Sequence, residues 1–278
     1  MTKTTEEYWA DSIQVLEWLE PVRKRPWMYI GSTDERGLHH LAWEIIDNSI
    51  DEAMAGHCND IIVTLTEDWA LSVEDNGRWI PVAKHAKTWK STLETILTVL
   101  HAGWKFGWGG YKVSWGLHWV GSSVVNALST KMEAWVHRDW NIYYMSFTRW
   151  KADSEIEIVW KSDKTGTIIK FYPDPDIFKI TTKLDYKTIK DRLRQQAYLT
   201  KWITLTLKDE RSDEKYKFYF EGWVKSYVNF LNKKEDTIWD IFYTEKENKD
   251  ILVEVALQYN NFCKQYSYSW RLNSLNLI

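Results

Sequence analysis

The segment GLHHLAWEIIDNSIDEAMAG, residues 37–56, decides the fold of this chain. Its apolar residues recur three and four positions apart, which is the spacing of an amphipathic helix, and Gly56 stands where a C-terminal cap belongs. The pattern therefore predicts a helix over about residues 36–55. On this helix Glu44, Asn48 and Asp51 share one face, because residues four and seven positions apart stack along a helix.

The pair Glu44 and Asn48 suits a specific chemistry because its neighbours Ile45 and Ile46 are apolar. A carboxylate there can orient and deprotonate a water molecule, and an amide oxygen can bind Mg²⁺ beside phosphates. The alternative is a solvated polar face, since other charged residues share the helix.

A predicted hairpin follows, with strands at 61–66 and 70–74, and the second strand runs into VEDNGRWIP, residues 73–81. The carboxylate of Asp75, at the strand end, can accept a hydrogen bond from an exocyclic amine such as that of adenine. Taken alone, Asp75 and Gly77 are also ordinary turn residues.

A glycine-rich segment, HAGWKFGWGGYKVSWGLHWVG (101–121), lies between helices expected at 92–101 and 120–128. Such loops bring backbone N–H groups close to anions, and Lys105 and Lys112 can neutralise phosphate charge. Each lysine is alternatively a solvated surface residue, and His118 is better explained by packing. The four tryptophans of the segment contradict a phosphate-binding role.

Further along the chain, helices and strands mix without regular βαβ alternation, which favours an α+β two-layer sandwich with a mixed sheet. A short helix is expected at 13–19, stopped by Pro21. We expect an arm at 1–12, a main domain at 13–220 and the start of a second, truncated α/β domain at 221–278. Further strands are expected at 131–137, 141–147, 155–160, 167–172, 203–208, 216–220 and 251–259, and further helices at 187–199 and 224–231.

The composition is that of a soluble globular protein, with 44% hydrophobic and 27% charged residues. A net charge of -3 gives no general attraction to nucleic acid or acidic membranes. The two cysteines form neither a disulfide framework nor a metal motif, which favours a reducing cytoplasm. No signal-like start or membrane-spanning apolar run is evident.

The order of these motifs resembles the ATPase region of the B subunits of bacterial type IIA topoisomerases, those of DNA gyrase and topoisomerase IV. The resemblance runs from about residue 8 to 268. It rests on QVLEWLEPVRKRPWMYIGST (14–33), the helix segment 37–56, VEDNGRWIP (73–81), LTVLHAGWKFGWGGYKVSWGLHWVGSSVVNALS (97–129) and DKTGT (163–167). Other ATPases with the same helix and Asp-x-Gly turn lack the segments that match residues 14–33 and 97–129.

The resemblance implies the GHKL ATPase fold, with ATP and Mg²⁺ as cofactors. It makes Glu44 the general base for water attack, Asn48 the Mg²⁺ ligand, and Asp75 the adenine-binding residue, helped by Thr167 through water. The remaining nucleotide-site residues that it implies are Asp51, Gly77, Arg78, Ile80, Pro81, Lys105, Lys112, Leu117, His118, Trp119, Val120, Gly121 and Arg138, with Tyr8 and Ile13 on an arm that reaches the partner protomer.

The resemblance also implies partners. ATP would close a homodimer gate for DNA strand passage and supercoiling, with the topoisomerase A subunit and with DNA bound through regions beyond residue 278. The segments ILVEVALQYN (251–260) and VHR (136–138) favour gyrase. The alternative is a catalytically dead truncated remnant or a nucleotide-binding dimerisation module.

The chain departs from the family pattern in one systematic way. Tryptophan stands where the family leads us to expect glycine at ten positions: Trp18, Trp27, Trp79, Trp89, Trp104, Trp108, Trp115, Trp119, Trp202 and Trp223. The chain has 19 Trp and only 12 Gly, whereas average usage predicts about 19 glycines. Trp43, in contrast, matches a tryptophan common in the family.

Our hypothesis is that UGA codons read as glycine in the source have been translated as tryptophan. A bulky residue in left-handed backbone costs about 1–2 kcal/mol. We therefore expect the chain as written to fold poorly and to hydrolyse no ATP. The alternative is a real aromatic surface that stacks on single strands or sugars.

Overall fold

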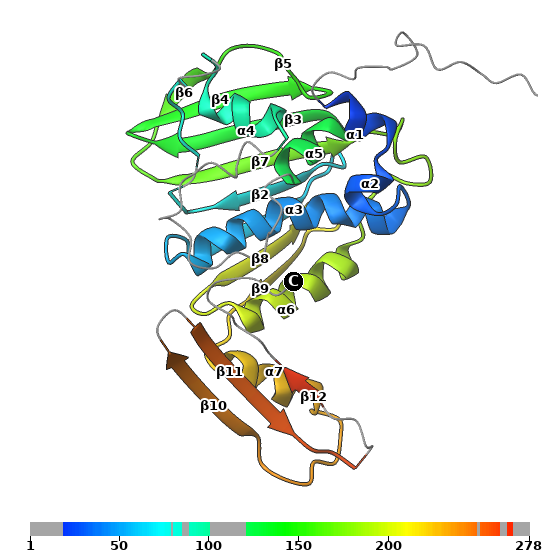
Figure 1. Ribbon diagram of the computed structural model, residues 1–278, viewed down its shortest axis with the longest axis vertical. Helices are drawn as coiled ribbons and strands as arrows, with labels where there is room; N and C mark the ends of the chain where they lie inside the picture. The colour runs from blue at the N-terminus through cyan, green and yellow to red at the C-terminus, as the bar shows by residue number, and fades with distance from the viewer. Residues whose placement is uncertain are drawn as a thin grey trace, which may run out of the picture.

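A nine-stranded mixed sheet forms the centre of the molecule (Figure 1). The computed structural model describes residues 19–78, 80–84, 89–100, 121–248, 251–261 and 266–268. The strands of the sheet are β1 (Asp60–Leu65), β2 (Leu71–Asp75), β3 (Ser129–Arg138), β4 (Asn141–Thr148), β5 (Lys151–Ala152), β6 (Glu157–Lys161), β7 (Gly166–Pro173), β8 (Thr204–Asp209) and β9 (Glu214–Phe218).

The strands lie in the order β5-β4-β3-β7-β2-β1-β8-β9, and β6 also pairs with β4. β1 and β8 run parallel, whereas the other neighbouring pairs are antiparallel. β2 therefore lies inside the sheet between β1 and β7, and its C-terminal residue Asp75 pairs with Thr167 of β7. This register brings two predicted site residues together.

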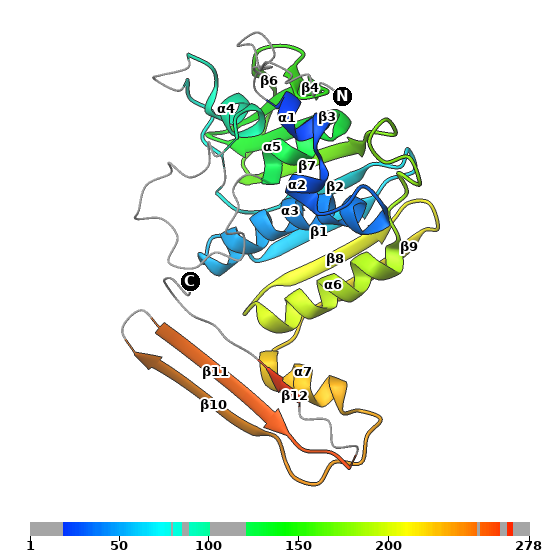
Figure 2. The same ribbon diagram turned by 45° about the vertical axis from the view of Figure 1, so that its right-hand side comes forward.

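Helices cover one face of this sheet, as Figures 1 and 2 show. They are α1 (Glu20–Lys24), α2 (Trp27–Ile30), α3 (Glu35–Met54), α4 (Thr92–Thr98), α5 (Gly121–Ala127) and α6 (Tyr186–Leu199). α3 begins at a side-chain cap, because Asp34 Oδ1 accepts hydrogen bonds from the backbone N–H of Arg36 and Gly37. Its buried residues Ile46 and Ile50 join one apolar core with Val73 of β2.

A second, smaller sheet lies beside α6 (Figure 2). It contains β10 (Phe242–Asn248), β11 (Ile251–Gln258) and β12 (Tyr266–Tyr268), and α7 (Trp223–Leu231) packs against it. Val224, Val228 and Ala256 form a small separate core. Tyr198 of α6 stacks on Tyr227 of α7 with ring centroids 5.0 Å apart, which ties the two parts together.

The α+β fold class is confirmed, and most predicted elements are observed with boundaries shifted by a few residues. The helix expected at 92–101 ends at Thr98. Pro21, the expected stop of a helix at 13–19, lies in the first turn of α1, where its missing N–H costs nothing. The helix expected at 13–19 lies almost wholly outside the described residues. Within the described ranges no helix is long and apolar enough to cross a membrane.

Candidate functional site

Glu44 lies near the middle of α3 with only 20% of its side chain exposed. Burial raises the pKa of its carboxyl to about 7, and the nearby carboxylates of Asp47 and Asp51 add to the effect. The Nδ1 atom of His40, one helical turn earlier, lies 3.3 Å from Glu44 Oε1. A carboxyl with a pKa near neutrality can take up a proton from water at physiological pH.

The start of α5 lies directly against this carboxyl. A Cβ atom at Gly121 would overlap Glu44 Oε2, so the close approach requires glycine. Next to it, Ser122 Oγ accepts a hydrogen bond of 2.8 Å from Asn48 Nδ2. This bond leaves the amide oxygen of Asn48 as the atom suited to a metal ion.

Asp75 ends β2 behind α3 and is only 7% exposed. Its Oδ2 accepts a hydrogen bond of 2.8 Å from Ser49 Oγ, and its Oδ1 accepts one of 2.9 Å from the backbone N–H of Gly77. Burial nevertheless raises the pKa of Asp75 to about 6. The side chain is thus held in one orientation by its neighbours.

Thr167 lies opposite Asp75 on β7 and is 4% exposed. Its Oγ1 is buried without a hydrogen-bond partner among the described residues. Such an orphaned hydroxyl is costly unless a ligand or a water molecule completes it. It belongs to the wall of a small cavity lined by Ile45, Asn48, Ser49, Val73, Asp75, Ile80, Leu97, Ser122, Thr167 and Ile169.

Two predicted site arginines, Arg78 and Arg138, contact each other but do not line this cavity. The backbone N–H and the Nε of Arg78 both donate to Oε1 of Glu52, which is wholly buried, at 3.0 and 3.2 Å. Arg138 donates from its guanidinium to the backbone oxygen of Arg78 at 3.5 Å. A Cβ at Gly77 would lie 2.5 Å from Glu52 Cγ, so glycine lets this turn pack on the buried carboxylate.

The segment after the turn is strained. Ile80, a β-branched residue that lines the cavity, has a φ of 47°. Such backbone is a genuine outlier for isoleucine, and strain of this kind concentrates at functional sites. Pro81 follows it and is half-buried.

The remaining predicted site residues divide into two groups. Asp51 is buried and acts on Glu44 through its charge, but it does not line the cavity. The others lie outside the described residues: Tyr8, Ile13, Lys105, Lys112, Leu117, His118, Trp119 and Val120.

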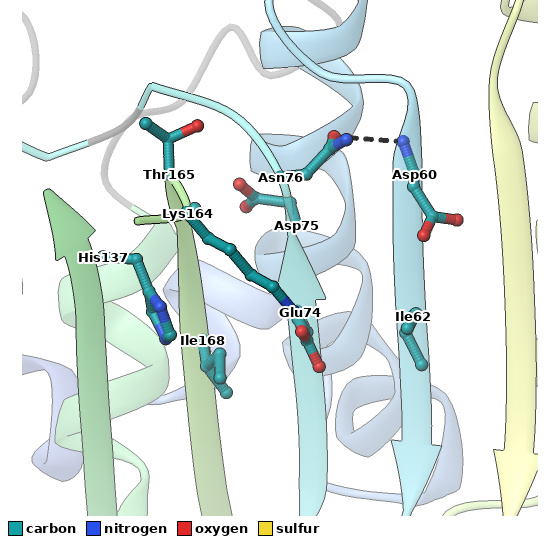
Figure 3. A pocket seen from close by; sticks show the side chains of 10 residues that line it. Asp60, Ile62, Glu74, Asp75, Asn76, His137, Lys164, Thr165 and Ile168 are labelled. Carbon is teal, nitrogen blue, oxygen red and sulfur yellow. Dashed lines mark hydrogen bonds between the residues drawn. The ribbon is translucent and has the colours of Figure 1, made fainter. Parts of the chain in front are cut away.

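A larger cavity of about 160 Å³ lies at the ends of the same strands, on the face of the sheet away from α3 (Figure 3). Glu74, His137 and Lys164 line it, and Asn76 Oδ1 accepts a hydrogen bond of 3.1 Å from the backbone N–H of Asp60. The carboxylate of Asp75 is bonded to Ser49 of α3, on the opposite face. The larger hollow is therefore not the site built around Glu44 and Asn48.

The sequence did not single out His40, Ser49, Glu52 or Ser122, although each contacts a predicted site residue. His40 had a signal, since it lies one turn before Glu44 on the same helix face. The contacts of Glu52 and Ser122 depend on how distant segments pack, and a single sequence does not reveal such pairings.

These features define a class of ATPase. Residues 33–177 match the family described as histidine kinase-, DNA gyrase B-, and HSP90-like ATPase, and the chain belongs to this family. Within it, the chain is 50% identical over 275 residues to the B subunit of DNA gyrase from Halalkalibacterium halodurans, which covers 98% of this chain and 43% of that protein. The DNA gyrase B subunit of Staphylococcus aureus is 52% identical over 261 residues, which covers 92% of this chain and 40% of that protein.

A solved structure agrees with these relatives. The crystal structure of the 43K ATPase domain of Thermus thermophilus gyrase B, in complex with an aminocoumarin, matches with a TM-score of 0.78 and 37% identity. The match covers 87% of this chain and 62% of that one. The chain thus spans less than half the length of the curated relatives that it matches.

Proposed function

We propose that this chain is the ATP-binding and ATP-hydrolysing N-terminal region of a type IIA DNA topoisomerase, similar to the gyrase B subunit. The observation that carries the proposal is the cavity that Asn48 and Asp75 line together with the orphaned buried hydroxyl of Thr167, with Glu44 one helical turn before Asn48 on α3. The relatives and the family support the same activity.

Adenine recognition is assigned to Asp75. Ser49 and Gly77 fix its carboxylate, which can then accept the hydrogen bond of an exocyclic amine. Thr167 Oγ1, which has no partner in the described part of the chain, would complete the contact through a water molecule. Val73, Ile80 and Ile169 supply apolar walls suited to a planar base.

The donor set also fits Mg²⁺. In the described residues, no cluster of three or more His, Cys, Asp or Glu side chains could hold a metal by itself. Mg²⁺ usually binds through one or two protein oxygens together with substrate phosphates and waters. The amide oxygen of Asn48 provides one such ligand, and the bound ion would neutralise phosphate charge.

Hydrolysis is assigned to Glu44. Its raised pKa makes it a base matched to neutral pH, and His40 lies within reach of its carboxylate. Gly121 lets the first turn of α5 approach that carboxylate, because a Cβ atom at this position would overlap Glu44 Oε2.

The wider role follows from the same family. ATP would close a homodimer gate through the arm that carries Tyr8 and Ile13, and hydrolysis would reset it during strand passage. The topoisomerase A subunit and DNA would join through parts of the protein beyond residue 278, in the cytoplasm. Residues 221–278 would begin the second domain that transmits the signal.

The experiment uses the chain with glycine at the ten positions named above, here called the ten-glycine chain. We expect it to bind ATP with Mg²⁺ in calorimetry and to release phosphate slowly in a radiolabelled assay. Glu44→Gln should remove the phosphate release and leave ATP binding intact. Glu35→Gln, on the first turn of the same helix, is the matched control and should change neither.

Two outcomes would count against the proposal. A folded ten-glycine chain that binds no ATP would refute nucleotide recognition, and unchanged hydrolysis in Glu44→Gln would refute the assignment of the base. Binding without any hydrolysis in the parent chain would favour the nucleotide-binding dimerisation module instead.

A further inference from the structure

Tryptophan dominates the residues with left-handed backbone. Ten residues other than glycine have positive φ in the described part of the chain, and six of them are tryptophans: Trp69, Trp89, Trp140, Trp150, Trp202 and Trp223. Bulky aromatic residues rarely adopt this backbone, whereas glycine adopts it freely. The resemblance to the topoisomerase family had pointed to Trp89, Trp202 and Trp223, but not to the other three.

Two of the new positions lie in β-hairpins of one type. β3 and β4 are joined by the two-residue loop Asp139–Trp140, with φ values of 51° and 66°. β4 and β5 are joined by Arg149–Trp150, with φ values of 47° and 67°. Positive φ at both central residues defines a type I′ turn, which strongly prefers glycine at the second position, as in Asp-Gly.

The third new position closes the hairpin between β1 and β2. The backbone N–H of Trp69 donates to the Thr66 carbonyl at 3.1 Å, and the N–H of Thr66 donates to the Ala70 carbonyl at 3.0 Å. Trp69 then has a φ of 65°. A turn followed by a left-handed residue is a standard hairpin connection, and that residue is usually glycine.

Most of the indoles at these turns lie outside the core, although Trp150 is half-buried and packs against it. Trp89 and Trp140 are 79% and 73% exposed. Trp223 is more buried, but its Nε1 has no hydrogen-bond partner among the described residues. A tryptophan chosen for packing would bury its rings and satisfy this donor. All six positions therefore share a glycine-like backbone, and at four of them, Trp69, Trp89, Trp140 and Trp202, the indole is exposed.

Three other tryptophans differ in backbone conformation, although Trp160 is also exposed. Trp43 lies in α3 with its ring centroid 5.9 Å from that of His39, and Trp135 lies in β3 with its centroid 5.1 Å from that of Tyr144. Trp160 lies in β6. Helix and strand backbone suits an aromatic residue, so these three positions carry no signal for glycine.

We infer that the native protein has glycine at positions 69, 140 and 150, as at 89, 202 and 223, and genuine tryptophan at 43, 135 and 160. The inference extends codon misassignment to hairpin turns that the family pattern did not mark. It concerns the residues of the chain and holds whether or not the chain hydrolyses ATP.

The gene provides the first test, because UGA and UGG would both have been translated as tryptophan. We expect UGA at the codons of Trp69, Trp140 and Trp150, and UGG at those of Trp43 and Trp135. A UGG codon at position 140 or 150 would overturn the inference at that turn. UGA and UGG distributed without regard to backbone, so that UGA also encodes Trp43 or Trp135, would overturn it altogether.

The native protein provides the second test. Trypsin cleaves after Lys131, Arg138 and Arg149, which gives neighbouring peptides of residues 132–138 and 139–149. Mass spectrometry of protein from the source cells should find tryptophan in the first peptide and glycine in the second. Tryptophan in the second peptide would refute the inference.

Stability provides the third test. Replacing Trp140 by glycine in the ten-glycine chain should raise the melting temperature by roughly 2–4 °C. Glycine at positions 69 and 150 should raise it by less, because the indoles there make cation–π contacts that glycine removes. Trp135→Gly is the matched control and should lower it, because the contact with Tyr144 is lost. A lower melting temperature after the three turn substitutions would contradict the inference.

Discussion

Gly121 and Asp75 at the α3–β2 site fit their surroundings better than the residues at the hairpin turns of β3, β4 and β5. At the site, Gly121 stands where a side chain would overlap Glu44, and buried Asp75 has partners for both oxygens. At the turns, Trp140 and Trp150 stand where the backbone favours glycine. A fold tolerates misfit residues at exposed turns more easily than at its centre, because an exposed side chain can project into solvent.

Contacts compensate for strain at one of the turns. At Trp69, Lys183 Nζ lies 4.0 Å and Arg211 Cζ lies 5.2 Å from the ring centroid, and both contacts have cation–π geometry. Each such contact contributes about 0.5–1 kcal/mol at exposed sites, whereas left-handed backbone costs a bulky residue about 1–2 kcal/mol. The two contacts are therefore comparable to the strain, and the case for glycine at position 69 rests on its backbone.

The largest expected effect comes from disrupting the close approach of Gly121 to Glu44. Gly121→Ala in the ten-glycine chain places a methyl group on Glu44 Oε2, so the base and the start of α5 must separate. We expect ATP hydrolysis to fall about 100-fold or more, since positioned general bases contribute at least that much. Phosphate release measures the change, and circular dichroism verifies folding. Retained hydrolysis in a folded variant would show that this close approach is dispensable.

The second effect concerns adenine binding. Asp75→Asn removes the charge that strengthens the hydrogen bond to an exocyclic amine, which contributes about 1.5–3 kcal/mol. The Kd for ATP, measured by calorimetry, should therefore rise about 10–100-fold. Glu74→Gln is the matched control. Glu74 directly precedes Asp75 in the sequence, is exposed, and lines the other cavity. Equal effects of both variants would contradict the assignment.

The sequence predicted the site residues better than the residues that contact and orient them. The helix periodicity of 37–56 placed Glu44 and Asn48 on α3, and the strand before Asp75 was also expected. The orphaned hydroxyl of Thr167 was not foreseeable without the β2–β7 register, because that pairing joins residues far apart in the chain. The same limit explains why the partner of Arg78, the buried Glu52, was missed.

Some secondary-structure elements were likewise not predictable from the sequence. β5 is only two residues long, and β10 has the charged sequence FYTEKEN, so neither had a clear strand pattern. The positive φ values at Trp140 and Trp150 were likewise invisible, because tryptophan carries no turn signal. Glycine at these positions would have marked both hairpins in the sequence.

A third prediction uses the raised pKa of Glu44. Because the base must be deprotonated, hydrolysis by the ten-glycine chain should rise roughly tenfold between pH 6 and pH 8. Stability should move the other way. The unfolded carboxyl loses its proton near pH 4.5 and the folded one near pH 7, so this group lowers the free energy of unfolding as pH rises between these values.

Glu44→Gln should remove this part of the pH dependence, as measured by urea unfolding at pH 5 and pH 7. Glu35→Gln again serves as the control, because Glu35 lies on the same helix and is exposed. An unchanged pH slope in Glu44→Gln would show that the carboxyl is not held at a raised pKa.

The smallest expected effect tests the turn between β3 and β4. Asp139 occupies the first central position, where asparagine also fits a type I′ turn. Its ion pair with Arg138, 3.4 Å long and exposed, contributes little. With glycine at position 140, Asp139→Asn should therefore change the free energy of unfolding by at most about 0.5 kcal/mol. Asp139→Val should cost more than this, because a β-branched residue is poorly suited to positive φ. Urea unfolding measures the stability of both variants. Equal stability of the two would show that this loop does not require left-handed backbone. That result would weaken the case for glycine at position 140.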